Sequence, residues 1–217
     1  MRRVLPILFN TEMVRANLDG RKSCTRRLVK GFVPDNAIWG YNAFTPKGCI
    51  SCRGTFADGY GEKFFKLPCE PGDILYVRET VWQKTGHYLD VDGETKAVWC
   101  NEFKYVATDE KPETGWNYSW VKRPSIHMPK EAARIWLKVT DVRVERLQDI
   151  TNKGAEREGA RPDYPFDYDV DKWPNLEHFK KIWNSTIKKS DRDRYGWNAN
   201  PWVWVIEFEQ CEKPEEN

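Results

Sequence analysis

The sequence lacks long apolar runs and lacks an excess of charge of either sign. No stretch of about 18 apolar residues is present, so we expect no membrane-spanning helix. The 35 basic and 33 acidic residues nearly cancel and leave a formal net charge of +2. This balance excludes a global attraction to nucleic acid, so any such binding has to come from a local basic patch.

The chain also lacks a dense cysteine framework, internal repeats and a linker. Its six cysteines are widely spread, unlike those of a small secreted domain. Residues 1–10 contain two arginines and an apolar stretch, but the stretch is too short for a signal peptide and has no small-residue cleavage site. We therefore expect a cytoplasmic protein with a single domain over 1–210 and an acidic tail over 211–217.

In this sequence, segments with strand-like patterns outnumber those with helical patterns. β-branched and aromatic residues predict four strands, over Val4–Phe9, Ile74–Thr80, Ile135–Leu147 and Trp202–Phe208. Lys22–Val29 is predicted as a further strand with basic flanks. A phase shift in the third strand predicts a bulge. Turn dipeptides predict two hairpins, one joining Cys49–Phe56 to Lys63–Leu67 and one centred on Asp92-Gly93.

Helical spacing occurs in three places and does not alternate regularly with the strands. The predicted helices are one capped by Thr11 and ended by Gly20, one over about 152–158 capped by Thr151, and one over Leu176–Ile187. We expect Phe103–Ala107 to add a strand and 109–120 to be a loop. The pattern favours an α+β fold, with a mixed β-barrel-like core and flanking helices.

The densest group of reactive side chains lies in residues 18–27, Leu-Asp-Gly-Arg-Lys-Ser-Cys-Thr-Arg-Arg. Lys22 and Thr25 are three residues apart, so an amine and a hydroxyl can meet if the chain turns there. A desolvated, neutral lysine can activate an oxygen nucleophile. The alternative is a solvated basic loop with Thr25 as an ordinary strand residue, which composition alone favours. Arg21, Arg26 and Arg27 also form a local basic patch that suits phosphate.

Three cysteines are weak candidates for a zinc site. Cys49 and Cys52 form a C-x-x-C pair and Cys69 follows, so three thiolates are available, but a second pair is missing. The fourth ligand would be one of Cys24, Cys100 or His87. The alternative is a set of reduced thiols in a hairpin, and we expect no metal or other cofactor.

Four further residues are candidate ligand contacts. Arg78 and Glu79 follow a strand, and at the mouth of a barrel they can read a base edge or a phosphate, or form a structural ion pair. Trp82, like the Tyr118–Trp120 cluster, is either a stacking surface or part of the core. His127 lies in an Arg-Pro-Ser-Ile-His-Met-Pro loop and is either a substrate contact or a loop histidine satisfied by backbone.

Taken in order, these segments resemble the ASCH domain family. The resemblance covers about 1–28, 68–82, 123–159 and 176–209, and is most specific at Gly20-Arg21-Lys22 with Thr25 and Arg27, at Pro71-Gly72-Asp73, and at Val205-Ile206-Glu207-Phe208. The Arg123–Pro129 segment is similar to the longer members that phages and prophages encode. The segments at about 31–66, 83–122 and 160–175 are then insertions. The resemblance implies a PUA-like β-barrel.

The resemblance also implies two kinds of function. Some small ASCH proteins are amidohydrolases that remove the acetyl group from N4-acetylcytidine, and PUA-like domains bind RNA or modified bases. The positions matching the enzymes' working set are Lys22, Thr25 and Glu158, with Glu156 as a competing carboxylate. We therefore expect an amidohydrolase with a threonine nucleophile and a lysine base, without a cofactor. The alternatives are a non-catalytic RNA-binding module and a phage protein that binds a host protein.

Overall fold

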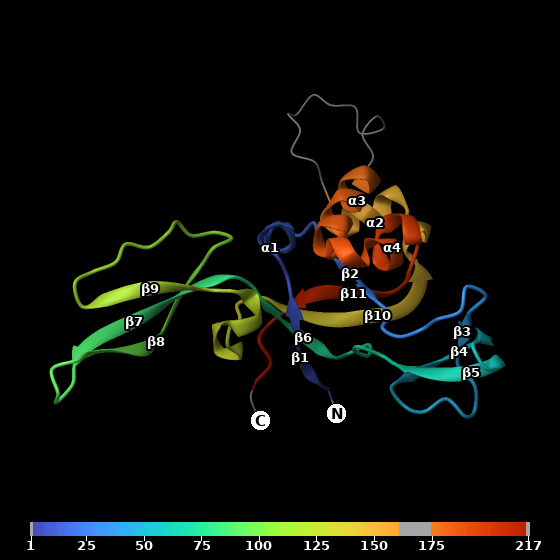
Figure 1. The fold of residues 1–217 in the computed structure, drawn as a ribbon, viewed down its shortest axis with the longest axis horizontal. Helices are drawn as coiled ribbons and strands as arrows, with labels where there is room; N and C mark the ends of the chain where they lie inside the picture. Colours follow the sequence, from blue (N-terminus) through green and yellow to red (C-terminus); the bar gives the residue numbers. More distant parts are fainter. Residues whose placement is uncertain (1, 161–174, 216–217) are drawn as a thin grey trace.

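The computed structural model describes residues 2–160 and 175–215. Its strands are labelled as in Figure 1: β1 (Val4–Leu8), β2 (Cys24–Leu28), β3 (Ile38–Gly40), β4 (Cys49–Phe56), β5 (Gly59–Lys66), β6 (Ile74–Arg78), β7 (Val81–Leu89), β8 (Thr95–Tyr105), β9 (Tyr118–Arg123), β10 (Trp136–Arg146) and β11 (Trp202–Cys211). The α-helices are α1 (Thr11–Leu18), α2 (Asn152–Arg157), α3 (Asn175–Thr186) and α4 (Arg192–Tyr195). Single 3-10 turns are η1 (Ser125–His127), η2 (Lys130–Ala132), η3 (Leu147–Asp149), η4 (Lys189–Asp191) and η5 (Trp197–Ala199). The predicted α+β class is confirmed.

Five strands form the central sheet, in the order β1-β6-β10-β11-β2. β1 runs parallel to β6, and the other neighbours are antiparallel. Pro6 is tolerated because β1 lies at an edge. The predicted bulge in β10 is confirmed by a register shift between Val139 and Asp141. Over the described ranges no strand joins β1 to β2, so hydrogen bonding does not close this sheet into a barrel, and only the coarser class is established.

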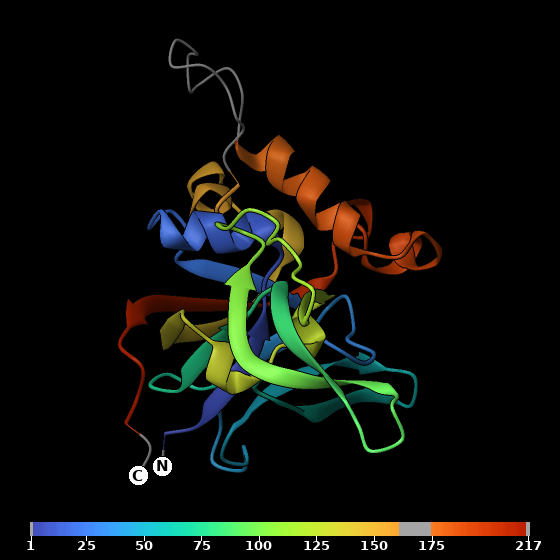
Figure 2. The same cartoon turned by 90° about the vertical axis from the view of Figure 1, so that its left-hand side faces the viewer.

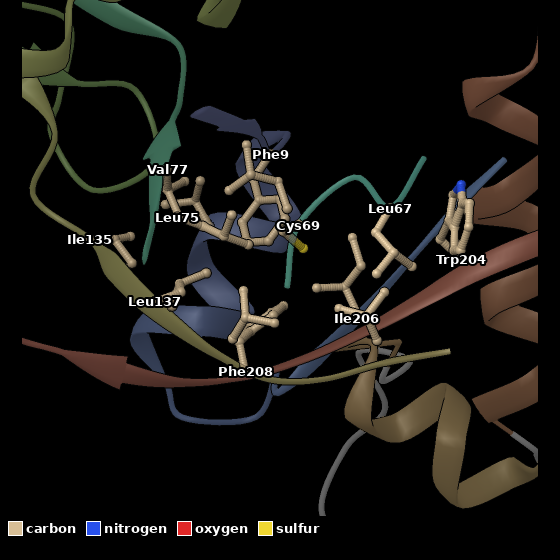
Figure 3. Close-up of a cluster of buried hydrophobic side chains, with 14 of the residues drawn as sticks. Phe9, Leu67, Cys69, Leu75, Val77, Ile135, Leu137, Trp204, Ile206 and Phe208 are labelled. Atoms are coloured by element: carbon tan, nitrogen blue, oxygen red, sulfur yellow. The ribbon is translucent and has the colours of Figure 1, made fainter. Parts of the chain in front are cut away.

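The last long strand, β11, is buried on both of its faces. Trp204, Ile206 and Phe208 belong to the larger hydrophobic core, which Figure 3 shows. Val203 and Val205 point the other way, into a smaller core that includes Phe179 and Trp183 of α3. A strand covered on both sides needs a continuous apolar run rather than alternation, which is the pattern in Trp202–Ile206.

Two three-stranded sheets flank the central one, in the orders β3-β4-β5 and β8-β7-β9. Figure 1 places them at opposite ends of the molecule. Figure 2, which looks from the β7–β8–β9 end, shows the helices gathered on one side of the strands. Both predicted hairpins are confirmed, as β4–β5 and β7–β8. We call β7, β8 and β9 the arm.

Several predicted boundaries are wrong. Asn10, and not Thr11, caps α1, because the Asn10 side chain accepts the Met13 N–H at 2.8 Å. The expected strand Phe103–Ala107 is the end of β8, and β9 begins inside the segment 109–120 that was expected to be a loop. Cys211 is part of β11, where pairing with Trp136 extends the strand into the expected tail.

Two further expectations concern membrane spans and the insertion before α3. In the ranges that the structure covers, no helix is long and apolar enough to cross a membrane. The expected insertion at about 160–175 lies almost entirely outside the described residues.

Candidate functional site

Lys22 is held by the turn that ends α1. Gly20 has φ +72°, a left-handed conformation that glycine adopts at little cost, so the chain can reverse there. The N–H groups of Arg21 and Lys22 then both donate to the Ala16 carbonyl, at 2.9 and 3.0 Å. The Asn17 side chain, fully buried, donates to the Lys22 carbonyl at 3.4 Å. These contacts fix the Lys22 backbone before β2 begins.

Glu158 is brought to Lys22 by a second helix end. Thr151 caps α2 by accepting the Gly154 N–H, as predicted, and Glu158 ends the helix. The next residue, Gly159, has φ +84°, and a Cβ there would lie 2.5 Å from the Ala16 Cβ. The C-terminal ends of α1 and α2 therefore meet at a point where only glycine fits.

Lys22 and Glu158 form a desolvated ion pair. Lys22 Nζ donates to Glu158 Oε2 at 2.9 Å, and to the carbonyls of Glu158 and Cys24 at 2.8 Å each. The two side chains are 0% and 4% exposed. Burial lowers the pKa of the Lys22 ammonium, while the Glu158 carboxylate works in the opposite direction. The Phe9 ring, with its centroid 5.2 Å from Nζ, adds to the apolar surroundings.

Arg26 binds the other oxygen of the Glu158 carboxylate. Its Nη1 lies 3.3 Å from Glu158 Oε1, and its Nη2 lies 3.2 Å from Glu145 Oε2. Glu145 in turn pairs with Arg143 at 2.6 Å, so the Lys22–Glu158–Arg26 cluster continues into a wider ion-pair network. A carboxylate with a lysine on one oxygen and an arginine on the other is held in a fixed orientation.

Thr25 lies beside this cluster and is not hydrogen-bonded to it. Successive strand residues point to opposite faces. The cross-strand partner of Thr25 is Ile206, which belongs to the larger core, while that of Arg26 is Val205, in the smaller one. Thr25 is fully buried, and its hydroxyl has no hydrogen-bond partner in the described chain. Among the described residues, no hydrogen bond joins it to Lys22 Nζ, so the expected base–nucleophile contact is not formed in this structure.

A cavity of about 220 Å³ opens along the free edge of β2. Glu158, Arg26 and Arg27 contribute its polar wall, and its apolar wall consists of Met13, Leu28, Phe179, Ile182, Trp183 and Ile187, with Thr186 beside them. Lys22 and Thr25 do not line the cavity. Glu158 therefore connects the buried lysine to a space that a small molecule can enter.

The predicted basic patch is not a free phosphate surface. Arg26 is buried in its two ion pairs, and Arg21 pairs with Asp19 at 2.9 Å. Arg27 donates to the carbonyls of Leu8 and Arg26, at 2.9 and 3.2 Å. These arginines are adjacent in sequence, but alternation along β2 sends Arg26 and Arg27 to opposite faces, where each meets protein acceptors.

Of the two alternatives for Arg78 and Glu79, the structure does not show the mutual ion pair, because each side chain has a different partner. Glu79 is 1% exposed and forms a two-fold ion pair with Arg134, at 2.8 and 3.0 Å, so it is not available to read a base. Arg78 donates to the Ile126 carbonyl. His127 is exposed on η1, and Trp82 is half-buried on the arm. None of these four has a recorded contact with the Lys22–Glu158 pair in the described residues.

The zinc alternative fails on geometry. Cys49 and Cys52 are three apart on β4, so their side chains point to opposite faces. Burial raises the pKa of the Cys52 and Cys69 thiols to about 11 and about 12, so both thiols are protonated when no metal is bound. Residues 2–160 and 175–215 contain no group of three or more His, Cys, Asp or Glu that could hold a metal ion.

Sequence reasoning missed Glu145 and the aromatic wall supplied by α3. The signal for Glu145 was a carboxylate inside the valine-rich run that became β10, since a charge in such a strand needs a partner. The signal for Phe179 and Trp183 was their i, i+4 spacing, which predicts a helix and by itself assigns neither residue to a site. Nothing in the sequence indicates that the Phe179 and Trp183 face of α3 also borders a cavity.

Comparisons with known proteins add no assignment. No protein-family model matches the chain, no curated protein matches it, and no solved structure matches it.

Proposed function

We propose that the protein is a PUA-like ASCH domain that removes the acyl group from an N4-acylated cytosine nucleoside, of which N4-acetylcytidine is the simplest. The observation that carries this proposal is the desolvated Lys22–Glu158 pair, whose carboxylate borders the cavity at the β2 edge. An amine with a lowered pKa is a suitable base, and a fixed carboxylate is a suitable partner for an amide N–H. The apolar and aromatic wall suits a flat base.

The reaction proceeds in two balanced steps. As the nucleoside binds, Lys22 passes a proton to Glu158, which leaves a neutral amine and a carboxylic acid. Thr25 Oγ1 then attacks the acyl carbon, and the Lys22 amine accepts the hydroxyl proton. The Glu158 carboxylic acid gives its proton to the leaving N4, so that the C–N bond breaks, cytidine leaves and the ion pair is restored. Water then cleaves the acyl-threonine ester, which releases the carboxylic acid and restores the hydroxyl. Because Thr25 is covered in this structure, the nucleoside has to open the wall between Thr25 and the cavity as it binds.

The test is cytidine release from N4-acetylcytidine, followed by chromatography. Thr25→Val keeps the shape and removes the hydroxyl, whereas Thr25→Ser keeps the hydroxyl. Glu158→Gln removes the carboxylate charge, and its matched control is Glu156→Gln, because Glu156 is exposed and only two residues away. We expect turnover by wild type, Thr25→Ser and Glu156→Gln, and a loss of at least about 100-fold in Thr25→Val and Glu158→Gln.

Two results would contradict the proposal. If Thr25→Val and Thr25→Ser were equally active, Thr25 would not be the nucleophile. If wild type, shown by circular dichroism to be folded, released no cytidine, the proposal that the protein is an amidohydrolase would be wrong. An RNA-binding module using the same groove is the weaker candidate, because Arg21, Arg26 and Arg27 already bind protein acceptors. That candidate requires steeply salt-dependent RNA affinity that charge removal at these arginines abolishes.

A further inference from the structure

The two faces of the arm differ in kind. Along β7, Val81, Gln83 and Thr85 are buried, and the residues between them are not. The alternation places the side chains of this sheet on two faces. The face of Val81 packs against Met128 and Ala132 at the base of the arm, but toward the tip its Trp99 is exposed. The face of Trp82, which we call the outward face, includes the exposed Lys96, Lys104 and Lys122. Figures 1 and 2 show the arm projecting from the body of the molecule, with the helices elsewhere. The outward face of the arm is therefore open to a ligand.

Cross-strand pairing arranges the outward side chains in rows, because directly opposed residues share a face. From the base of the arm to its tip, the rows are Lys104–Trp82–Lys122, Lys84–Trp120, Val98–Gly86–Tyr118 and Lys96–Tyr88. We call these residues the outer arm face. Consecutive rows are two residues apart along β7, which is about 7 Å. Aromatic rings and lysines thus alternate across three strands, although they come from segments up to about 40 residues apart in the chain.

Lysines rest on the aromatic rings of this face. Lys122 Nζ lies 5.7 Å from the centroid of Trp82, and Lys84 Nζ lies 5.0 Å from that of Tyr118. Glu102 pairs with Lys84, and Asp90 with Lys96. Within the described chain, Lys104 and Lys122 form no salt bridge, so the face has a positive surplus. Trp82 and Tyr118 therefore each have a cation within reach of a ligand that stacks on them.

We propose that the outer arm face binds single-stranded nucleic acid. Unpaired bases stack on Trp82, Trp120 and Tyr118, and the lysines turn from the rings to the phosphates. At the centre of this face, Gly86 has no side chain, so the space above its backbone is free for a base. A Cβ there would have only the Cys100 sulfur as a neighbour, at 3.7 Å. A duplex does not fit this chemistry, because its bases already stack on one another. Charge complementarity favours a polyanion over a neutral protein surface.

This inference does not depend on the proposed hydrolase. The outer arm face consists of β7, β8 and β9, whereas the Lys22–Glu158 site consists of β2, α1, α2 and α3. Loss of one function by mutation leaves the other intact. Failure of the two proposals is therefore distinguishable in separate assays.

The experiment is fluorescence anisotropy of a labelled oligo(U) 12-mer, an oligo(dT) 12-mer and a hairpin duplex, over a series of salt concentrations. Three changes to the full chain are compared. Lys104→Gln with Lys122→Gln removes two cations, and Tyr118→Leu removes one ring. Lys63→Gln is the matched control, because Lys63 Nζ also lies over an aromatic ring, Phe56 at 4.4 Å, but on β5.

We expect saturable binding of one or both single strands and at least about tenfold weaker binding of the duplex. The double lysine variant should bind at least about tenfold more weakly and reduce the salt slope by about 0.7 per lysine. Tyr118→Leu should weaken binding about tenfold and leave the salt slope unchanged. Binding of neither single strand, preference for the duplex, or equal losses in Lys63→Gln would overturn the proposal.

Discussion

Lysine lies over an aromatic ring in two regions of this molecule, with different consequences. At the end of α1, Lys22 Nζ is 5.2 Å from the Phe9 ring and wholly enclosed, and Glu158 binds it. On the arm, Lys122 Nζ is 5.7 Å from the Trp82 ring and exposed. Water stabilises the exposed ammonium of Lys122. At the buried Lys22 ammonium, three protein acceptors take the place of water. The same type of contact, a lysine over an aromatic ring, therefore differs with burial. The buried lysine needs the Glu158 carboxylate, whereas the exposed lysine can exchange the ring for another partner.

Breaking the buried ion pair should have the largest effect. Glu158→Gln leaves Lys22 and Arg26 without their shared counter-charge in a dry site, so we expect the free energy of unfolding to fall by about 3–5 kcal/mol. Urea unfolding followed by circular dichroism measures this. Glu156→Gln on the same helix should change stability by less than about 0.5 kcal/mol. Similar values for the two variants would mean that the buried pair has little structural importance.

The approach of the two helix ends is the next test. Gly159→Ala introduces a strained φ and a methyl group 2.5 Å from the Ala16 Cβ, so we expect a loss of about 2–4 kcal/mol in unfolding free energy. Gly93→Ala, at a turn in the arm with φ +78° and no atom within 4 Å of the added Cβ, has the strain without the clash. Its loss should be about 1 kcal/mol. Equal losses in thermal or urea unfolding would show that the helix contact is not tight.

The buried region should also show its desolvation in a pH series. Burial raises the pKa of the Cys24 thiol from 9.0 to about 12, so the folded protein holds this proton more tightly than the unfolded chain does. The thiol's stabilisation is complete below pH 9 and is lost as the pH rises toward 12. Relative to Cys24→Ala, wild type should lose about 1 kcal/mol by pH 10. Parallel stability curves for the two proteins, from urea unfolding at pH 8 to 10, would contradict this.

The smallest effect is expected on the arm. Lys84→Gln removes an exposed ion pair with Glu102, in which solvent already stabilises both charges. We expect no measurable change in the thermal midpoint, in contrast to the loss in Glu158→Gln. A large drop in the thermal midpoint would show that Lys84 stabilises the fold of the arm and is not available to bind a ligand.

The strands and most turns could be predicted from the sequence because local signals determine them. The continuous apolar run of β11, the bulge in β10 and the Thr151 cap are all visible in neighbouring residues. The Lys22–Glu158 contact is different, because its partners are 136 residues apart and depend on Gly159 packing against Ala16. The resemblance supplied the residue types of the site, and the structure placed Lys22 and Glu158 together.

The basic patch, the Arg78–Glu79 ion pair and the cysteine site are alternatives that require sequence neighbours to lie together in space, and the structure separates these neighbours. Arg26 and Arg27, and also Arg78 and Glu79, alternate across strands and find separate partners. Cys49 and Cys52 diverge for the same reason. The rows of the outer arm face are the opposite case, since Trp82 and Lys122 meet only through strand pairing. A ladder register, which a single sequence does not reveal, determines both outcomes.

The most direct test of the buried site is the rate of cytidine release from N4-acetylcytidine by wild type and Lys22→Met. Methionine fills the space of the lysine stem and cannot accept a proton. Lys153→Met, at an exposed position on α2, is the control. We predict release by wild type and Lys153→Met, and none above background by folded Lys22→Met. Release at the wild-type rate by Lys22→Met, or none by wild type, would contradict the assignment of this pair as the reactive centre.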